Sequence, residues 1–461
     1  MIVDEERPIR STDPFRPDEV VAEAESWGSD AVAAAVEHGR KAAAEWRATP
    51  APARAQAMGA AADAVAGAAA ELTELVIREV GKPRAEAPGE VQRAISILRY
   101  YAQQTLDPDG ETYPAPDARS LLMARRRPRG LVTLITPWNF PIAIPLWKAA
   151  PALAYGNAVL LKPAREAIGV ALKVQELIAP HLPDHLLQVA PGDSTIAQAL
   201  LRASDAVSFT GSTEAGRHVA RAATEAGIPA QCEMGGQNAS IVLADADRQR
   251  AATQIAGAAM GYAGQKCTAT SRVIVVGEDN GFTEALVAAV AALPQGDPGE
   301  QGVQVGPVIN EAARRDVVEA AEEARSEGGR VIAGGQAGAG LGWMVAPTLV
   351  SGLPAEASLN QREVFGPIAA IIQASDDGDA VAIANGVRQG LVTSVYTSDL
   401  ARALSVVDNL DTGLIRVNAP TSGVDFYAPF GGEKSSSHGP REQGKAAREF
   451  YTSIRTVTIT P

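Results

Sequence analysis

The chain has 461 residues, 46% of them hydrophobic, which is enough to build the cores of about two or three domains. Its formal net charge of −13 and isoelectric point near 5.0 argue against nucleic acid as a partner, because nucleic-acid-binding proteins usually carry a basic face. The sequence shows no signal-peptide pattern at its start and no apolar run approaching about 18 residues. Its two cysteines, Cys232 and Cys267, indicate no disulfide framework. We therefore expect a soluble cytoplasmic protein that binds no membrane, for which small anionic ligands stay open because a local cationic pocket fits inside an acidic protein.

The first third of the chain reads as helices followed by an arm. Residues 28–72 are rich in alanine with scattered charges, which predicts amphipathic helices, and a further helix is expected over 91–104. Three prolines and one glycine predict a loop over 107–117. Residues 120–127 form an arm that ends in Arg125-Arg126-Arg127. This run favours a solvated or subunit-contacting strand over an anion site.

Beyond Gly130, short apolar runs alternate with helical segments, as in βαβ units built on a parallel sheet. The first series has strands at 131–135, 158–161, 186–190 and 206–209, and helices at 144–154, 168–179, 194–201 and 213–224. A second series starts near Ala239, with strands at 271–276, 330–333, 367–372, 392–396 and 413–417. This pattern predicts two α/β domains around a site near residues 233–267. The chain closes with an alternating strand, 456–460, that has no obvious partner nearby.

Cys267 is a candidate nucleophile. It lies in Gly264-Gln265-Lys266-Cys267-Thr268, where the glycine permits close approach of a substrate. The adjacent Lys266 would favour the thiolate, which is the reactive form of cysteine. A lone cysteine is more often a buried and inert thiol, so this motif needs support from others.

Two further polar residues follow apolar runs. Glu233 precedes two glycines and suits a general base that activates water, although a solvated loop glutamate fits equally well. Asn139 lies between Pro137 and Pro141, which restrict the backbone and suit a rigid hydrogen-bond donor for an oxyanion. Asparagine is also common in proline-rich turns.

Gly211 and Ser212 follow another apolar run and open a helix. Ser212 suits the N-cap, and the free amides of the first turn would bind a phosphate, although the spacing departs from the usual dinucleotide fingerprint. Lys162 ends a strand on the expected ligand side of the sheet and would bind a ribose or phosphate. A lysine at a strand end is otherwise a plain surface residue.

Together these segments resemble the aldehyde dehydrogenase superfamily over residues 28–460. The matching motifs are Pro137-Trp138-Asn139-Phe140-Pro141, Lys162-Pro163, Phe209-Thr210-Gly211-Ser212, Glu233-Met234-Gly235-Gly236, Gly264-Gln265-Lys266-Cys267, Glu363-Val364-Phe365-Gly366-Pro367 and Pro429-Phe430-Gly431-Gly432. They occur in the order that the family has.

The resemblance implies an α/β fold with a Rossmann-type cofactor domain, a second α/β catalytic domain and a small oligomerisation β-element. The cofactor domain would cover 1–112 and 131–234, and the catalytic domain 235–428. The oligomerisation element would combine an arm, 113–130, with a return segment and strand, 429–461. A homodimer or homotetramer is implied, and no metal.

The resemblance also implies roles for individual residues. Cys267 attacks the aldehyde, and Asn139 together with the Cys267 backbone amide holds the oxyanion. Hydride passes to a nicotinamide, which leaves a thioester, and Glu233 activates the water that cleaves it. Lys148 and Glu442 match positions that relay the proton. The implied cofactor contacts are Thr136, Pro137, Trp138, Lys162, Arg165, Gly211, Ser212, Glu363 and Phe365.

Two departures from the family pattern matter. Members that use NAD often carry an acidic residue three positions after the Lys162 position. This chain has Arg165 there, and its acidic residue, Glu166, comes one position later. An arginine there accommodates a 2′-phosphate, so NADP is slightly favoured over NAD. The C-terminal motif contains an inserted Pro440 before Arg441-Glu442, a version similar to that of bacterial α-ketoglutaric semialdehyde (2,5-dioxovalerate) dehydrogenases. The insertion makes the placement of Glu442 less certain.

The expected substrate is a short oxo-acid semialdehyde such as 2,5-dioxopentanoate. A distant carboxylate on the aldehyde needs a cation, and Arg93 and Lys266 match positions where relatives bind anionic aldehydes. Arg93 in an ordinary helix-surface ion pair is the alternative. Neutral aliphatic or aromatic aldehydes remain a second substrate class, and a non-catalytic structural relative is a third function. A CoA-acylating enzyme is disfavoured because it needs no water-activating base.

Overall fold

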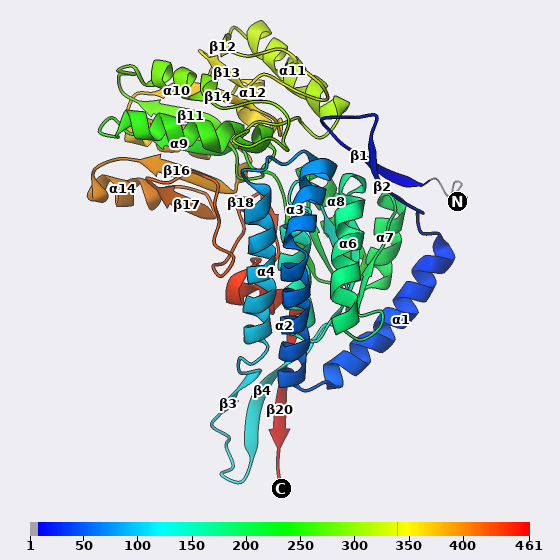
Figure 1. Ribbon diagram of the computed structural model, residues 1–461. Helices are drawn as coiled ribbons and strands as arrows, with labels where there is room; N and C mark the ends of the chain where they lie inside the picture. Colours follow the sequence, from blue (N-terminus) through cyan, green and yellow to red (C-terminus); the bar gives the residue numbers. More distant parts are fainter. Residues whose placement is uncertain (1–7, 339) are drawn as a thin grey trace.

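The computed structural model describes residues 8–338 and 340–461. Two bodies built of helices and sheets lie one above the other, and a narrow three-stranded arm projects from the lower one (Figure 1). Within the described ranges, no helix is long and apolar enough to cross a membrane.

The lower body is organised around a six-stranded sheet with the order β19-β9-β8-β5-β6-β7. The four strands predicted in the first series are confirmed to within two residues. The strands are β5 (Leu131–Thr136), β6 (Ala158–Pro163), β7 (Leu187–Val189), β8 (Ala206–Thr210), β9 (Ala230–Glu233) and β19 (Ser437–His438). All pairings are parallel except that of β19 with β9. Since helices cover both faces of a parallel sheet, its strands are apolar almost throughout.

Most helices of the lower body fall in the predicted segments, but the helix over 69–80 continues beyond the predicted 28–72 and the helix over 447–451 was not predicted. The predicted segment 28–72 is divided at Pro50, and Pro88 at the start of α4 moves that helix four residues ahead of the prediction. The helices are α1 (Ser29–Ala48), α2 (Ala51–Gly67), α3 (Ala69–Val80), α4 (Ala87–Gln104), α5 (Ala143–Ala154), α6 (Ile168–Ile178), α7 (Ser194–Ala203), α8 (Thr213–Ala226) and α15 (Ala447–Tyr451). A small hairpin, β1 (Ile9–Thr12) and β2 (Val20–Ala24), precedes them.

The upper body contains a seven-stranded sheet with the order β12-β13-β14-β11-β10-β16-β17. Its strands are β10 (Asn238–Val242), β11 (Thr270–Val276), β12 (Arg330–Ala333), β13 (Thr348–Ser351), β14 (Ile368–Ala374), β16 (Val392–Tyr396) and β17 (Leu414–Val417). Only the edge strand β12 pairs antiparallel. The short β13 was not predicted from the sequence.

The helices of the upper body are α9 (Arg248–Met260), α10 (Phe282–Ala291), α11 (Glu311–Ser326), α12 (Ser358–Gln361), α13 (Asp377–Asn385) and α14 (Leu400–Val407). A two-residue ladder, β15 (Gln389–Gly390) with β18 (Glu433–Lys434), joins this body to the return segment of the chain.

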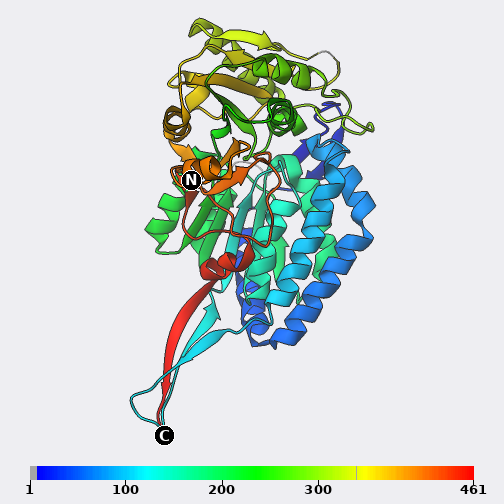
Figure 2. The same ribbon diagram turned by 90° about the vertical axis from the view of Figure 1, so that its left-hand side faces the viewer.

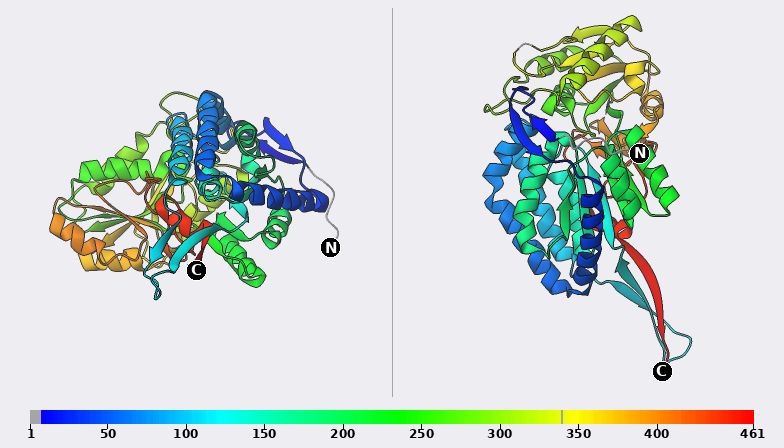
Figure 3. Two further views of the ribbon diagram at one scale, coloured as in Figure 1. Left: turned by 90° about the horizontal axis from the view of Figure 1, so that it is seen from below. Right: turned by 90° about the vertical axis from the view of Figure 1, so that its right-hand side faces the viewer.

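The arm corrects two predictions. The predicted loop 107–117 contains β3 (Gly110–Tyr113), because Pro114 and Pro116 follow this strand and leave its hydrogen-bonding groups free. The C-terminal strand, predicted over 456–460, is β20 (Thr452–Ile459), and its partner is β4 (Leu121–Pro128). The sheet order is β20-β4-β3, so segments more than 300 residues apart in sequence lie side by side. Figures 2 and 3 show the arm extending away from both bodies.

Candidate active site

A cavity of about 340 Å³ lies where the ends of strands from the two bodies meet. Its walls come from six separated segments of the chain. The lining residues are Pro137, Trp138, Asn139, Ile144, Trp147, Thr210, Gly211, Ser212, Glu233, Met234, Gly235, Cys267, Glu363, Phe365 and Phe430. Nine of the residues singled out in the sequence therefore share one cavity.

The loop that carries Cys267 has an unusual backbone. Tyr262, Ala263 and Gly264 all have positive φ angles, of 54°, 51° and 67°. A Cβ atom at Gly264 would lie 2.2 Å from the carbonyl oxygen of Gly366, so only glycine fits there. This strained turn follows α9 and fixes the direction in which the chain continues toward Cys267. Contacts with the surrounding structure hold the turn, because residues other than glycine rarely adopt positive φ angles by themselves.

Asn238 anchors the same loop from the start of β10. Its Nδ2 donates to the carbonyl oxygens of Cys267 and Ala269, at 2.7 and 2.8 Å. These bonds turn the carbonyl of Cys267 away from the cavity and thereby orient its peptide. The sequence analysis did not identify Asn238, although a buried asparagine beside a strand is a signal that could have been used.

The surroundings of Cys267 oppose the thiolate in the resting enzyme. Burial, together with the carboxylates of Glu363 and Glu233, raises the pKa of the Cys267 thiol to about 12. The expectation that Lys266 favours the thiolate is wrong, because the pKa of the thiol is raised and the Lys266 ammonium group bonds instead to Glu86 at 2.8 Å. The proton on Cys267 must therefore leave when substrate and cofactor change this environment.

Asn139 follows β5 and reaches the nucleophile loop. Its Nδ2 donates to the carbonyl oxygen of Gln265 at 3.0 Å, which leaves its second N–H for a ligand. Among the described residues its Oδ1 is buried without a partner. Asn139 and Cys267 thus face one cavity from opposite bodies. The hydrogen bond from Asn139 to Gln265 holds the two residues in a fixed relative position.

Glu233 ends β9 and lies in the cavity as a buried carboxyl. Ser437 Oγ donates to its Oε2 at 2.5 Å, because β19 places Ser437 directly opposite Glu233. Burial first, and then the neighbouring Glu442, raise the pKa of Glu233 well above its ordinary value, while Ser437, Lys148 and Arg441 oppose the shift. A carboxyl with a raised pKa is suited to accepting and returning a proton near neutral pH.

Lys148 and Glu442 form a buried ion pair behind Glu233. Lys148, on α5, also donates to Ser208 Oγ at 2.8 Å, and Ser208 in turn contacts Gln231 at 3.0 Å. Backbone bonds between Phe430 and Glu442 hold the return segment here despite the inserted proline. Ser208 and Gln231 were missed because single polar residues in apolar strands carry no motif, although their position in fully buried strands is a usable signal.

One wall of the cavity has the groups that a dinucleotide needs. Ser212 caps α8, accepting from the backbone N–H of Ala215 at 3.3 Å, so the first turn of that helix faces the cavity mouth. Thr136 and Thr210 each have a buried Oγ1 without a partner among the described residues. Such orphaned hydroxyls fit the ribose and amide groups of a bound cofactor.

Glu363 and Phe365 close the wall beyond Cys267. Glu363 accepts from the backbone N–H of Gly236 at 3.2 Å, and burial raises its pKa to about 7. A Cβ at Gly235 would come within 1.6 Å of Glu363, so the glycine makes room for the carboxyl. Phe365 packs edge-on against Trp138 with ring centroids 5.8 Å apart, so two aromatic rings at nearly a right angle line this part of the cavity.

Lys162 and Arg165 lie beyond this cavity. Lys162 ends β6 and is half-buried, and burial lowers its pKa while Glu166 and Asp193 oppose the shift. Glu166 is therefore close enough to Lys162 to raise the pKa of its ammonium group. The Arg165 side chain, in contrast, is exposed.

Arg93 and Lys266 are not among the residues that line the cavity. Arg93, on α4, donates to the carbonyl oxygen of Val424, and burial lowers its pKa. It is thus held against the loop before Phe430 and not in a surface ion pair. Lys266, paired with Glu86, borders a small separate hollow on the other side of Glu363.

The family model described as "Aldehyde dehydrogenase family" matches residues 2–457. The chain belongs to the aldehyde dehydrogenase family. The resemblance drawn from the motifs is thereby confirmed, and the chain is an enzyme that oxidises aldehydes with NAD or NADP.

Three relatives in the family share a substrate name. An α-ketoglutaric semialdehyde dehydrogenase of Bacillus subtilis is 36% identical, covering 98% of this chain and 95% of the relative. An α-ketoglutarate semialdehyde dehydrogenase of Haloferax volcanii is 40% identical, with coverage of 97% and 94%. A 2,5-dioxopentanoate dehydrogenase of Saccharolobus solfataricus is 34% identical, with coverage of 96% and 94%.

Solved structures confirm the aldehyde dehydrogenase fold. An NADP-dependent enzyme from E. coli has a TM-score of 0.95 and 33% identity, with coverage of 99% and 95%. Betaine aldehyde dehydrogenase from Staphylococcus aureus in complex with NAD⁺ has a TM-score of 0.95 and 27% identity, with coverage of 98% and 92%.

Proposed function

We propose that this enzyme oxidises a short oxo-acid semialdehyde, such as 2,5-dioxopentanoate, to the corresponding dicarboxylic acid. The observation that carries the proposal is the shared substrate name of three relatives that match nearly the whole chain at 34–40% identity. The nucleophile, the carboxyl and the amide donor gathered in one cavity support the aldehyde chemistry.

In the proposed mechanism, Cys267 Sγ bonds to the aldehyde carbon and loses its proton. The aldehyde oxygen then carries the negative charge, which Asn139 Nδ2 and the backbone N–H of Cys267 stabilise. A bound nicotinamide supplies the hydride acceptor that converts the adduct to a thioester. Thr136, Trp138, Gly211, Ser212, Glu363 and Phe365 would hold that cofactor against the sulfur.

Glu233 would then take a proton from the water that cleaves the thioester. The electrostatic coupling of Glu233 to Glu442 and Lys148 offers the proton a route away from the cavity. Water as the final acceptor distinguishes this scheme from acyl transfer to a thiol, which needs no such base. The same intact set of groups argues against a non-catalytic structural relative.

A panel of aldehydes tests the substrate. We expect kcat/KM to be largest for 2,5-dioxopentanoate among semialdehydes and neutral aldehydes of equal length. The apolar side chains of Trp147, Phe430 and Met234 on the cavity wall favour neutral aldehydes as the second candidate. A preference for hexanal or benzaldehyde over every semialdehyde would refute the proposal and leave only the family activity.

We further propose that Arg93 attracts the substrate carboxylate from the cavity mouth. Arg93→Met should raise KM for carboxylated aldehydes and spare neutral ones. Arg99→Met is a matched control, since Arg99 lies on the same helix but pairs with Asp63 at the surface. An equal change in KM for both aldehyde classes would remove Arg93 from this role. Lys266 is proposed as a secondary cation that would need to leave Glu86.

For the cofactor, we infer a slight preference for NADP. The exposed Arg165 is free to meet a 2′-phosphate, while Glu166 near Lys162 favours the unphosphorylated ribose. Arg165→Glu should lower kcat/KM for NADP relative to NAD. A strong NAD preference in the native enzyme that Arg165→Glu leaves unaltered would contradict the inference.

We also infer that the enzyme is a homodimer or homotetramer joined through the arm. The apolar side chains of Leu121, Ile454 and Ile459 are exposed on its sheet and suit contact with another subunit. A cytoplasmic location, consistent with the free thiols Cys232 and Cys267, stays a prediction.

A further inference from the structure

A second cavity, more than twice the volume of the one that Cys267 lines, lies away from the active site. It has a volume of about 790 Å³ and lies at the base of the arm, between the end of α1, the start of α2, and the strands β4 and β20. Seven arginines and two aspartates line it, in a chain whose net charge is −13. The arginines are Arg47, Arg54, Arg125, Arg126, Arg127, Arg448 and Arg455.

The strand register brings like charges together in this cavity. Arg125 on β4 pairs directly with Arg455 on β20. Arg127 lies two residues further along β4 and therefore on the same face as Arg125. Like charges directly opposite each other on a sheet destabilise it, so the pairing of Arg125 with Arg455 is unfavourable by itself. An anion that contacts both guanidinium groups would offset this repulsion.

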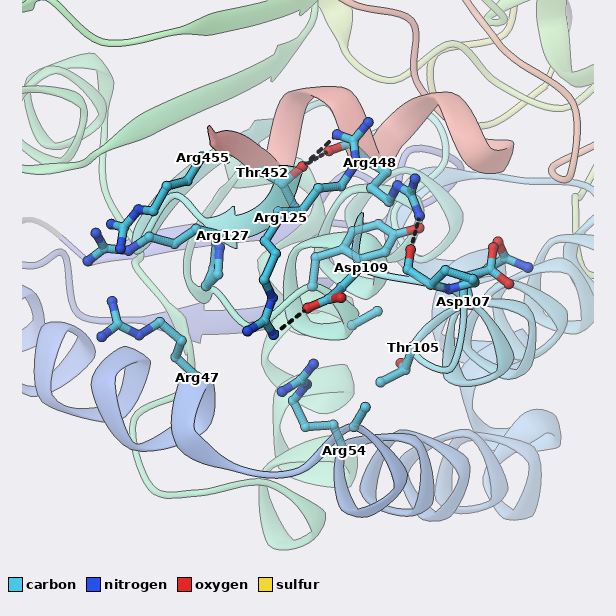
Figure 4. A pocket seen from close by; sticks show the side chains of 18 of the residues that line it. Arg47, Arg54, Thr105, Asp107, Asp109, Arg125, Arg127, Arg448, Thr452 and Arg455 are labelled. Carbon is cyan, nitrogen blue, oxygen red and sulfur yellow. Dashed lines mark hydrogen bonds and ion pairs between the residues drawn. The ribbon is translucent and has the colours of Figure 1, made fainter. Parts of the chain in front are cut away.

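The charges are only partly neutralised within the chain. Arg125 bonds to Asp109 at 2.8 Å, and Arg126 pairs with Glu449. The side chains of Arg47, Arg127 and Arg455 make no ion pair or hydrogen bond with any described residue. Figure 4 shows their guanidinium groups extending toward the same side of the cavity.

The inner walls add further donors. Arg54, half-buried at the start of α2, donates to the carbonyl oxygen of Thr49 at 2.6 Å, and its Nε is buried without a partner among the described residues. Its side chain rises toward Arg125 from the opposite wall (Figure 4). Arg448 Nη1 donates to the carbonyl oxygen of Pro108 at 2.9 Å and keeps its other donors.

We propose that this cavity binds a small multivalent oxyanion bearing phosphate or carboxylate groups. A planar guanidinium group pairs bidentately with two oxygens of a phosphate or of a carboxylate. Because several guanidinium groups lie on different walls of the cavity, a ligand that contacts them together needs more than one anionic group. The volume lies in the range of sites for small organic ligands. The sequence favoured a solvated or subunit-contacting strand for Arg125-Arg126-Arg127. The anion site proposed here also needs Arg47, Arg54 and Arg455, which the arginine run alone does not supply.

Isothermal titration calorimetry on the full-length enzyme tests the proposal. Pyrophosphate and citrate are the probes, because one carries phosphates and the other carboxylates. Excess NADH and NADPH occupy the dinucleotide site, so that pyrophosphate binding there does not contribute heat. We expect saturable binding of at least one probe, weakened by added salt as charged contacts are screened.

Two variants and a control assign that binding to the cavity. Arg127→Gln/Arg455→Gln should weaken it by at least about tenfold for each arginine removed, and Arg47→Gln, on a different wall, by about tenfold. Arg119→Gln should leave it unchanged, because Arg119 lies on the arm, pairs with Asp117 and is outside the cavity. Without ligand, the double variant should have the same or a higher melting temperature, because repulsion is relieved.

Three results would overturn the proposal. The first is that neither probe binds saturably, and the second is that both variants bind the probes with unchanged affinity. The third is that the double variant sediments as a smaller particle while its affinity for the anion is unchanged. The last would mean that carboxylates of a second copy of the chain occupy the arginines.

Discussion

Around Cys267, carboxyl groups and not cations set the electrostatics. Glu363 and Glu233 both raise the pKa of the thiol, and Glu442 contributes from further away. Glu233 and Glu363 have raised pKa values themselves because burial penalises their charged forms. Burial thus opposes ionisation of the thiol and of both carboxyl groups, and ionisation of either carboxyl group further disfavours the thiolate.

Cys267→Ala should abolish turnover, because no covalent adduct can form. Glu233→Gln should lower steady-state turnover by roughly 10²–10⁴-fold while a burst of reduced cofactor survives. Stopped-flow absorbance at 340 nm measures both. Cys232→Ala is the control, since that buried thiol lies in β9 and does not line the cavity. Steady-state activity of the Cys267 variant at the native level would rule out the covalent mechanism.

Asn139→Ala should lower kcat by about 10²–10³-fold, the usual effect of losing one oxyanion donor. The measurement is kcat on protein whose circular dichroism spectrum is native, because Asn139 also bonds to Gln265. An unchanged kcat would show that Asn139 only holds the loop.

Ser437→Ala should move the acidic limb of the kcat profile to higher pH. The hydrogen bond from Ser437 lowers the pKa of Glu233, so its loss raises that pKa further. The base acts only when ionised, and more alkaline conditions are then needed to ionise it. Ser437→Thr, which keeps the hydroxyl, should restore the profile. A uniform loss of kcat with no shift would indicate a structural role alone.

At the scale of elements, Glu79 joins three parts of the lower body. From α3 its carboxylate accepts from Ser11 Oγ of β1 at 2.6 Å and from the backbone N–H groups of Gly169 and Val170 at 2.6 and 2.7 Å. The last two belong to the first turn of α6, which the carboxyl caps. Burial nevertheless raises the pKa of Glu79 to about 7.

This shift predicts a loss of stability as pH rises. The folded state holds the proton more tightly than the unfolded chain, so the contribution is complete below the ordinary carboxyl pKa and disappears as pH passes about 7. The amount is about 3 kcal/mol by linkage. Glu233 and Glu363 act in the same direction. Glu79→Gln should therefore reduce, but not remove, the fall in melting temperature between pH 5 and pH 8.

Glu71→Gln is the matched control for this experiment. Glu71 lies on the same helix, pairs with Lys173 and has 61% of its side chain exposed, so its replacement should leave the pH dependence as in the native enzyme. A fall in melting temperature that is identical in the native and Glu79 proteins would contradict the linkage.

At the scale of the whole molecule, the arm carries apolar side chains that do not pack against the rest of the chain. Ile454 and Ile459 of β20 are 62% and 54% exposed, and β20 is an edge strand. Exposed apolar edges of this kind invite pairing with another chain. Ile454→Glu/Ile459→Glu should therefore shift the sedimentation coefficient toward that of a monomer. Leu400→Glu, 73% exposed on α14, should not. An unchanged coefficient in the arm variant would place the subunit contact elsewhere.

The sequence alone was sufficient to predict the features that depend on local patterns of residues, namely the two sheets and the motifs of the site. Alternating apolar runs predicted both sheets, because hydrophobic periodicity reports burial directly. The resemblance of the motifs around Asn139, Glu233 and Cys267 to those of one enzyme family predicted that the three residues belong to one site. The structure places all three in a single cavity.

Only the tertiary structure decided the contacts between residues far apart in the chain. Ser437 meets Glu233 because an antiparallel pairing brings a short C-terminal strand to β9, and Arg455 faces Arg125 by the same kind of long-range register. Lys266 looked like a partner of Cys267 but lies against Glu86, about 180 residues earlier. Neighbours in sequence point in different directions once the backbone is fixed, and the partner that a charge finds depends on which segments the fold brings together.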